Sequence, residues 1–98
     1  MELSTKQKRW LKGQAHSLDP LVRVGKAGLA PGVLEQAEEV LARHELVKAR
    51  FVADRDERKA QAAELAAVTG AVLIGTIGRV AILYRAKVDP DERRYKLP

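Results

Sequence analysis

The sequence predicts a compact single domain of the α/β (α+β) class, with the element order α-β-α-β-α-β-β and a mixed four-stranded sheet covered by helices. Apolar residues recur at helical spacing in the segment after Pro31 and alternate with basic residues in the segment after Glu45. Glycine, proline and capping residues stand at the boundaries of these segments. The 98 residues suit one domain, and with only 4% aromatic residues its core must be aliphatic.

The first predicted helix begins at a capping motif. Ser4 is followed three positions later by Gln7, the spacing at which the two side chains satisfy each other's backbone amides. The helix is expected to end near Gly13 or Gln14. Pro20 then introduces a short extended run at residues 21–24, which is the first predicted strand.

The second helix is expected from Pro31 to about His44. Proline suits the first turn of a helix, where its missing N–H is not needed. The apolar residues after it recur every three or four positions, which is typical of a helix with one buried face.

A second strand is predicted over residues 46–52, because apolar and basic residues alternate there. Asp54 or Asp56 can cap a third helix that runs to about Thr69 and ends at Gly70. We expect strands separated by helices to pair in parallel through right-handed crossovers.

A hairpin closes the predicted domain. Residues 71–77 and 79–85 are both rich in β-branched and aliphatic residues, and Gly78 stands between them. We therefore place the domain at residues 1–85. Residues 86–98 are charged and contain two prolines, so we expect a loose tail.

Positive charge is concentrated at the two ends of the chain. The net charge is +5, and residues 1–28 contain six basic and two acidic side chains. The segment 29–45 is acidic, and residues 79–98 are again basic. Segregated basic surface attracts a polyanion, although the same charge could serve only to keep a small protein soluble.

Several classes of function are not indicated. The chain has no cysteine, so thiolate metal sites and cysteine nucleophiles are excluded. We find no catalytic motif, no metal-ligand pattern, and no sign of a cofactor or of a small-molecule substrate. No targeting or membrane-spanning segment is predicted, and we expect a cytoplasmic monomer.

The most informative motif is Gly25-Lys26-Ala27-Gly28, at a predicted strand-to-helix junction. Two glycines three apart let the backbone approach a ligand closely, and the helix start that follows can favour phosphate. Lys26 adds a cation at the tip. The same physics underlies the GxxG loop that clamps nucleic-acid backbone in KH modules. By itself the spacing is also compatible with a plain turn.

The chain as a whole resembles the CRM domain family (chloroplast RNA splicing and ribosome maturation), in its bacterial YhbY-like stand-alone form. The matching residues run over most of the chain. They are Leu3-Ser4-Thr5-Lys6-Gln7, Leu11-Lys12-Gly13, Ala15-His16, Pro20, Val24-Gly25-Lys26-Ala27-Gly28-Leu29, Gly32-Val33, His44-Glu45-Leu46-Val47-Lys48, Thr69-Gly70-Ala71, Ile77-Gly78-Arg79 and Leu83-Tyr84-Arg85.

The resemblance implies a fold similar to the C-terminal domain of translation initiation factor three. It also implies RNA binding, in association with ribosomal RNA or with precursors of the large ribosomal subunit. The family's glycine loop corresponds to Gly25–Gly28. At Ala30 relatives often carry a threonine that could cap the second helix, so the cap is in doubt here.

The candidate RNA-binding residues combine the loop with the basic residues at both ends of the chain. For the basic residues outside the loop, solvent exposure or an ion pair is an open alternative. A second hypothesis is a protein-interaction adaptor that docks a partner on the acidic second helix, through Glu35, Glu38 and Glu39. The RNA candidates are Gly25, Lys26, Ala27, Gly28, Lys6, Lys8, Arg9, Lys12, Arg79 and Arg85.

Overall fold

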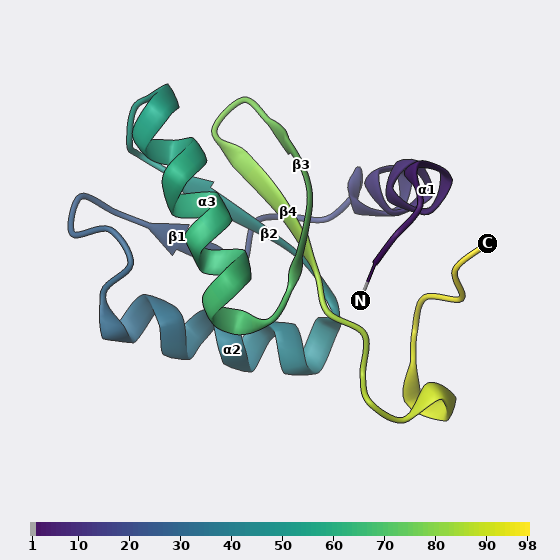
Figure 1. Cartoon of the computed structure of the whole chain (residues 1–98). Helices are drawn as coiled ribbons and strands as arrows, with labels where there is room; N and C mark the ends of the chain where they lie inside the picture. Colours follow the sequence, from purple (N-terminus) through teal and green to yellow (C-terminus); the bar gives the residue numbers. More distant parts are fainter. Residues whose placement is uncertain (1) are drawn as a thin grey trace.

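The computed structural model describes residues 2–98 and confirms the predicted order of elements (Figure 1). The three α-helices of this part of the chain are α1 (Thr5–Ala15), α2 (Pro31–His44) and α3 (Arg55–Thr69). The strands are β1 (Val22–Val24), β2 (Leu46–Phe51), β3 (Val72–Ile77) and β4 (Val80–Tyr84), and a 3₁₀ turn follows at Pro90–Glu92.

The helix ends follow the capping signals in the sequence. The Ser4 Oγ accepts from the Gln7 N–H at 3.1 Å, and the Gln7 Oε1 accepts from the Ser4 N–H at 3.0 Å. Asp54 caps α3 by accepting from the Glu57 N–H at 3.1 Å. Gly70, at φ +70°, ends α3 in the left-handed conformation that glycine adopts without strain.

The sheet order is β1-β2-β4-β3, which corrects one expectation. β1 and β2 are parallel, as predicted for strands joined by a helix. β2 and β3 do not pair, because β4 lies between them and is antiparallel to both. The physical reason is that four consecutive residues of β4, Ala81–Tyr84, are buried, so this strand needs cover on both faces and a central position.

Two hydrophobic cores lie on opposite faces of the sheet. The larger core joins the sheet to α2 and α3, and it includes Val47, Ala49 and Phe51 from alternate positions of β2. The smaller core joins the other face to α1, and it includes Leu46 and Tyr84. In Figure 1, α2 and α3 accordingly lie on one side of the strands and α1 lies on the other.

The expectation of a loose tail was wrong, because residues 86–98 fold back onto the smaller core. The Tyr95 ring contacts Trp10 and Tyr84 edge-on, at centroid distances of 6.3 and 6.5 Å. Leu97 packs against the same cluster. Apolar side chains spaced along a charged segment are enough to dock it, and this was not visible in its composition.

Glu45 holds the tail in place. Its side chain is fully buried, and its carboxylate accepts from the backbone N–H groups of Lys87 at 2.9 Å and Arg94 at 2.6 Å. Its carbonyl accepts from the Arg85 N–H at 2.8 Å. Glu45 also has φ +65°, which turns the chain directly from α2 into β2. A buried carboxylate needs such partners. Glu45 thus connects the α2–β2 junction to the end of β4 and to the tail.

Candidate nucleic-acid interface

The glycine loop projects beyond the end of β1, where the structure forms a tight turn. The Gly28 N–H donates to the Gly25 carbonyl at 3.0 Å, and the Ala30 N–H donates to the Gly28 carbonyl at 2.9 Å. Gly28 has φ +70°, so this position favours glycine. Lys26 and Ala27 are therefore left exposed at the tip of the loop.

The start of α2 behind the loop carries no side-chain cap. Ala30 is the N-cap residue and Pro31 is the first helical residue, so neither provides a side-chain oxygen to the helix amides. This bears out the doubt about the cap that Ala30 raised. The Val33 and Leu34 N–H groups both donate to the Ala30 carbonyl instead.

Arg79 lies at the same end of the sheet as the loop and braces the neighbouring turns. One nitrogen of its guanidinium donates to the carbonyls of Val52 at 3.1 Å and Ala53 at 3.0 Å. These bonds tie the β3–β4 turn to the segment between β2 and α3. The Arg79 side chain thus has a structural contact and also remains exposed at the loop end.

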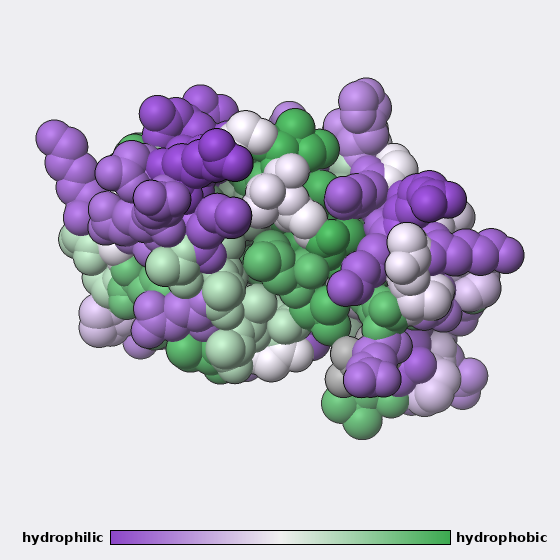
Figure 2. Space-filling view, turned by 45° about the horizontal axis from the view of Figure 1, so that its top comes forward, coloured by the Kyte–Doolittle hydropathy of each residue, from purple (hydrophilic) through white to green (hydrophobic). Residues whose placement is uncertain are grey.

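A second group of basic residues at this end was missed by the sequence analysis. Arg55, Arg58 and Lys59, from the first turns of α3, line a depression together with Thr76 and Gly78 of the hairpin turn. Figure 2 shows hydrophilic side chains gathered at the upper left, where α3 begins. The helical spacing of these three residues was the available signal, but the acidic residues beside them mask it in a sum over the segment.

The basic residues of α1 lie on the other side of the sheet from α2 and α3. Lys6, Arg9 and Lys12 are exposed, and Lys8 is half-buried. Lys12 extends toward the sheet, and its side chain occupies the space beside Gly75 of β3, where a Cβ atom would lie 2.4 Å from the Lys12 Cε. Among these four basic residues of α1, the contact with Gly75 is made by Lys12 and places its side chain over the sheet.

Arg85 lies at the opposite end of the sheet from the loop and is engaged in internal contacts. One guanidinium nitrogen bonds the Glu38 carboxylate and donates to the Thr69 carbonyl at 2.8 Å, and the other donates to the Glu38 carbonyl at 3.3 Å. The structure therefore brings the loop and Arg79 together, and it places Arg85 apart from them. An RNA contact by Arg85 stays a prediction, and we leave Arg85 out of the interface.

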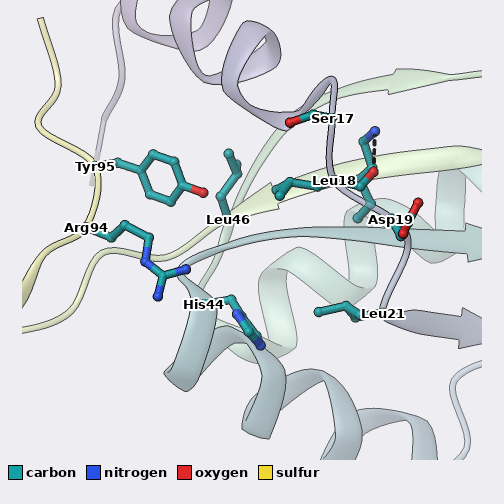
Figure 3. Close-up of a pocket in the computed structure, with 9 residues that line it drawn as sticks. Ser17, Leu18, Asp19, Leu21, His44, Leu46, Arg94 and Tyr95 are labelled. Carbon is teal, nitrogen blue, oxygen red and sulfur yellow. Dashed lines mark hydrogen bonds between the residues drawn. The ribbon is translucent and has the colours of Figure 1, made fainter.

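A pocket of about 300 Å³ lies at that same far end, between the tail and the start of β2 (Figure 3). Leu18 and Leu46 point into it, and the Tyr95 hydroxyl and the Arg94 guanidinium approach it from the tail. Lys48 lines the pocket, but its ammonium donates to the carbonyls of Leu18 at 2.9 Å and His16 at 3.4 Å. The Lys48 ammonium is therefore held by backbone carbonyls of the protein itself.

Residues 2–98 contain no cluster of three or more His, Asp and Glu side chains that could hold a metal ion. No helix in this part of the chain is long and apolar enough to cross a membrane. The loop end is an open, basic surface built from the backbone turn at Gly25–Gly28 and from exposed cations. Such a surface suits contacts with a charged backbone.

A sequence model of the CRS1 / YhbY (CRM) domain matches residues 3–85. The chain belongs to the CRM domain family. An "RNA-binding protein" of Haemophilus influenzae is 41% identical over 98% of this chain and 95% of its own length. YqeI of Bacillus subtilis, named a probable RNA-binding protein, is 37% identical over 98% of this chain and 99% of its own length. Neither name describes a catalytic activity.

The fold also matches a solved structure. SAV1595 of Staphylococcus aureus, a hypothetical protein proposed to bind RNA, superimposes with a TM-score of 0.84 at 32% identity. The match covers 99% of this chain and all of that one. CRM membership and the mixed α+β fold are thus established by sequence and by structure.

Proposed function

We propose that this protein binds structured RNA, in ribosomal RNA or in precursors of the large ribosomal subunit, through the end of the sheet that carries the glycine loop. The observation that carries the proposal is a set of exposed cations around the loop. The side chains of Lys26, Arg55 and Lys59 form no hydrogen bond or ion pair with any other residue that the structure describes. Exposed, unpaired cations are free to replace the counterions of a phosphate backbone.

RNA is favoured over a smaller anion because of the shape and extent of this surface. The basic residues come from the β1–α2 loop, the first turns of α3 and the hairpin turn, and no deep cavity encloses them. Several phosphates can therefore be contacted at once, while bases are not enclosed. Affinity is expected from backbone contacts and selectivity from RNA shape. The names of the relatives point to the same class of ligand.

The first test is a fluorescence-anisotropy titration of large-subunit ribosomal RNA fragments, beside duplex DNA of matched sequence, over a salt series. We expect tighter binding to structured RNA, with a log–log salt slope that corresponds to several phosphate contacts. Equal and weak binding to RNA and DNA would overturn the proposal.

The role of the loop is tested by Gly28→Asp against Gly28→Asn. Both side chains tolerate a positive φ better than other residues do, and they have nearly the same size, so both variants carry similar backbone strain at φ +70°. Only aspartate adds negative charge next to Lys26. We expect RNA affinity roughly tenfold weaker for the aspartate variant than for the asparagine variant. Equal affinities in two folded variants would remove the loop from the interface.

A second candidate function is the protein-interaction adaptor. A shallow apolar groove of about 540 Å³ lies between α2 and α3, and Leu34, Val68 and the glutamates of α2 line it. Val68 is 58% exposed there. The groove suits an apolar segment with basic residues. If Glu35→Lys with Glu39→Lys leaves ribosome association intact, the adaptor hypothesis fails.

A further inference from the structure

The face of the sheet that α1 packs against is only partly covered. The register places Arg23 of β1 beside Arg50 of β2, Arg50 beside Val80 of β4, and Val80 beside Ile77 of β3. Residues opposite each other on neighbouring strands point to the same face. Arg23 and Arg50 are exposed, and Ile77 is 61% exposed, so α1 leaves this row open to solvent.

The two arginines in this row are an unfavourable pair. Neighbouring strands lie about 4.8 Å apart, and like charges directly opposite each other destabilise a sheet. Neither arginine side chain forms an ion pair or a hydrogen bond with any residue in the described part of the chain. Lys48, one row away on the same face, is instead held by two backbone carbonyls. The fold therefore keeps two adjacent positive charges without a counter-charge of its own.

Lys12 extends this basic row from the side of α1. Gly75 pairs with Ile82 in the row next to that of Val80, and the Lys12 side chain lies against it. Any side chain at position 75 would meet the end of the Lys12 side chain. The absence of a Cβ atom at Gly75 thus lets a third cation lie across β3, close to the open row.

The chemistry of this surface favours phosphates over bases. Base recognition in single strands relies on stacking against exposed aromatic rings. The Tyr95 ring packs edge-on against the rings of Trp10 and Tyr84, and Phe51 is buried in the larger core. Guanidinium groups, in contrast, match the geometry of phosphate oxygens through paired N–H donors.

We infer that Arg23, Arg50 and Lys12 form a second RNA contact, a phosphate-binding strip on the open sheet face that continues the interface from the glycine loop. This inference rests on the proposed RNA binding. Arg23 stands two residues before Gly25, so the strip and the loop are contiguous on β1. Together they allow a folded RNA to contact the protein around the edge formed by β1. The ligand class is the sugar–phosphate backbone of structured RNA, contacted without base readout.

The test is the double variant Arg23→Gln with Arg50→Gln. Its matched control is Arg43→Gln with Lys96→Gln, which removes the same charge from exposed positions outside the strip. For a structured ribosomal RNA fragment, we expect the strip variant to bind roughly tenfold more weakly, with a log–log salt slope reduced by about two. The control should change affinity less than about twofold. Urea unfolding should show that the strip variant is as stable as the wild type or more so, because a repulsive pair has been removed.

The outcomes separate this inference from the proposed function. If Gly28→Asp weakens RNA binding while the strip variant matches the control, RNA binding by the loop stands and the strip is overturned. If the wild-type protein binds RNA no better than duplex DNA, the proposed function and the strip are both overturned. If the strip variant alone loses affinity and salt dependence, the strip is supported.

Discussion

The two ends of the sheet contain the same types of charged residue but use them differently. At the tail end, the Glu45 carboxylate accepts from two backbone N–H groups, and the Arg85 guanidinium donates to the Thr69 carbonyl. Both charged groups are largely shielded from water. At the loop end, the charged groups of Lys26, Arg23 and Arg50 form no ion pair or hydrogen bond within residues 2–98. The first set stabilises the fold, and the second set is available to a ligand.

The comparison shows that a basic residue in a family signature can be engaged in contacts within the protein. Arg85 belongs to the Leu83-Tyr84-Arg85 signature, yet its guanidinium joins α2 and the end of α3 to β4. Arg23 lies outside the motifs on which the family resemblance rests, yet its side chain is exposed and has no ion-pair partner among the residues that the structure describes. Arg85 and Arg23 have the same charge, but of the two only Arg85 has a counter-charge within the described part of the protein. The presence of such a partner distinguishes them better than the sign of the charge does.

The largest effect that would sharpen this contrast is expected at Glu45. Glu45→Ala removes the acceptor for two backbone amides and keeps the unfavourable φ, so the free energy of unfolding should fall by about 3 kcal/mol. Glu45→Gly removes the same carboxylate, but glycine tolerates φ +65°. The free energy of unfolding of this variant should therefore be about 1 kcal/mol higher than that of Glu45→Ala. Urea titration measures both. Equal losses in the two variants would mean that backbone strain at this residue is negligible.

A smaller effect is expected at Arg85. Arg85→Ala breaks the pair with Glu38 and leaves the Thr69 carbonyl without this donor, which should cost about 2 kcal/mol of stability. The control is Arg43→Ala, because the Arg43–Glu39 pair is highly exposed and should contribute less than about 0.5 kcal/mol. RNA affinity should stay within about twofold in both variants. A tenfold loss for Arg85→Ala at full folding would return Arg85 to the interface.

The smallest effect concerns Tyr84 and appears only at high pH. Burial raises the pKa of the Tyr84 hydroxyl above its ordinary value of 10.0, the nearby Glu45 raises that pKa further, and Arg93 lowers it. Because the pKa is higher in the folded than in the unfolded state, this group's contribution to stability is present below pH 10 and is lost as the pH rises through the folded-state value.

Tyr84→Phe should remove that part of the alkaline destabilisation. The free energy of unfolding of the wild type, measured against that of the variant, should decline between neutral pH and values above 10. Circular dichroism with urea at several pH values measures the difference. Parallel pH profiles would show that the tyrosine titrates alike in the folded and unfolded chains.

The helices and strands were predictable because their signals are local. The Ser4–Gln7 capping box, the Asp54 cap and Gly70 each act within a few residues of the chain, and each sits where the sequence placed it. The position of β4 in the sheet was not predictable in this way. It depends on which strand has two apolar faces when all elements are assembled, and the expected parallel pairing of neighbours was overridden.

The candidate site was predictable only in part. The glycine loop and Arg79, which the sequence analysis grouped together, lie at the same end of the sheet. Arg55, Arg58 and Lys59 lie there too, but they come from a segment whose net charge is nearly neutral. The Arg23–Arg50 pair depends on the register of two strands separated by a whole helix. The docked tail depends on one buried carboxylate and one tyrosine. Neither the Arg23–Arg50 pair nor the docked tail leaves a periodic pattern in the sequence.

The central place of β4 has a consequence for how the chain folds during synthesis. Both neighbours of β4 are completed before it leaves the ribosome, and until then β2 and β3 have no strand between them. The closing contacts of Glu45 with the tail form later still. The sheet therefore cannot be completed before β4 has been synthesised, and we expect pairing between segments that are distant in the sequence to slow its folding.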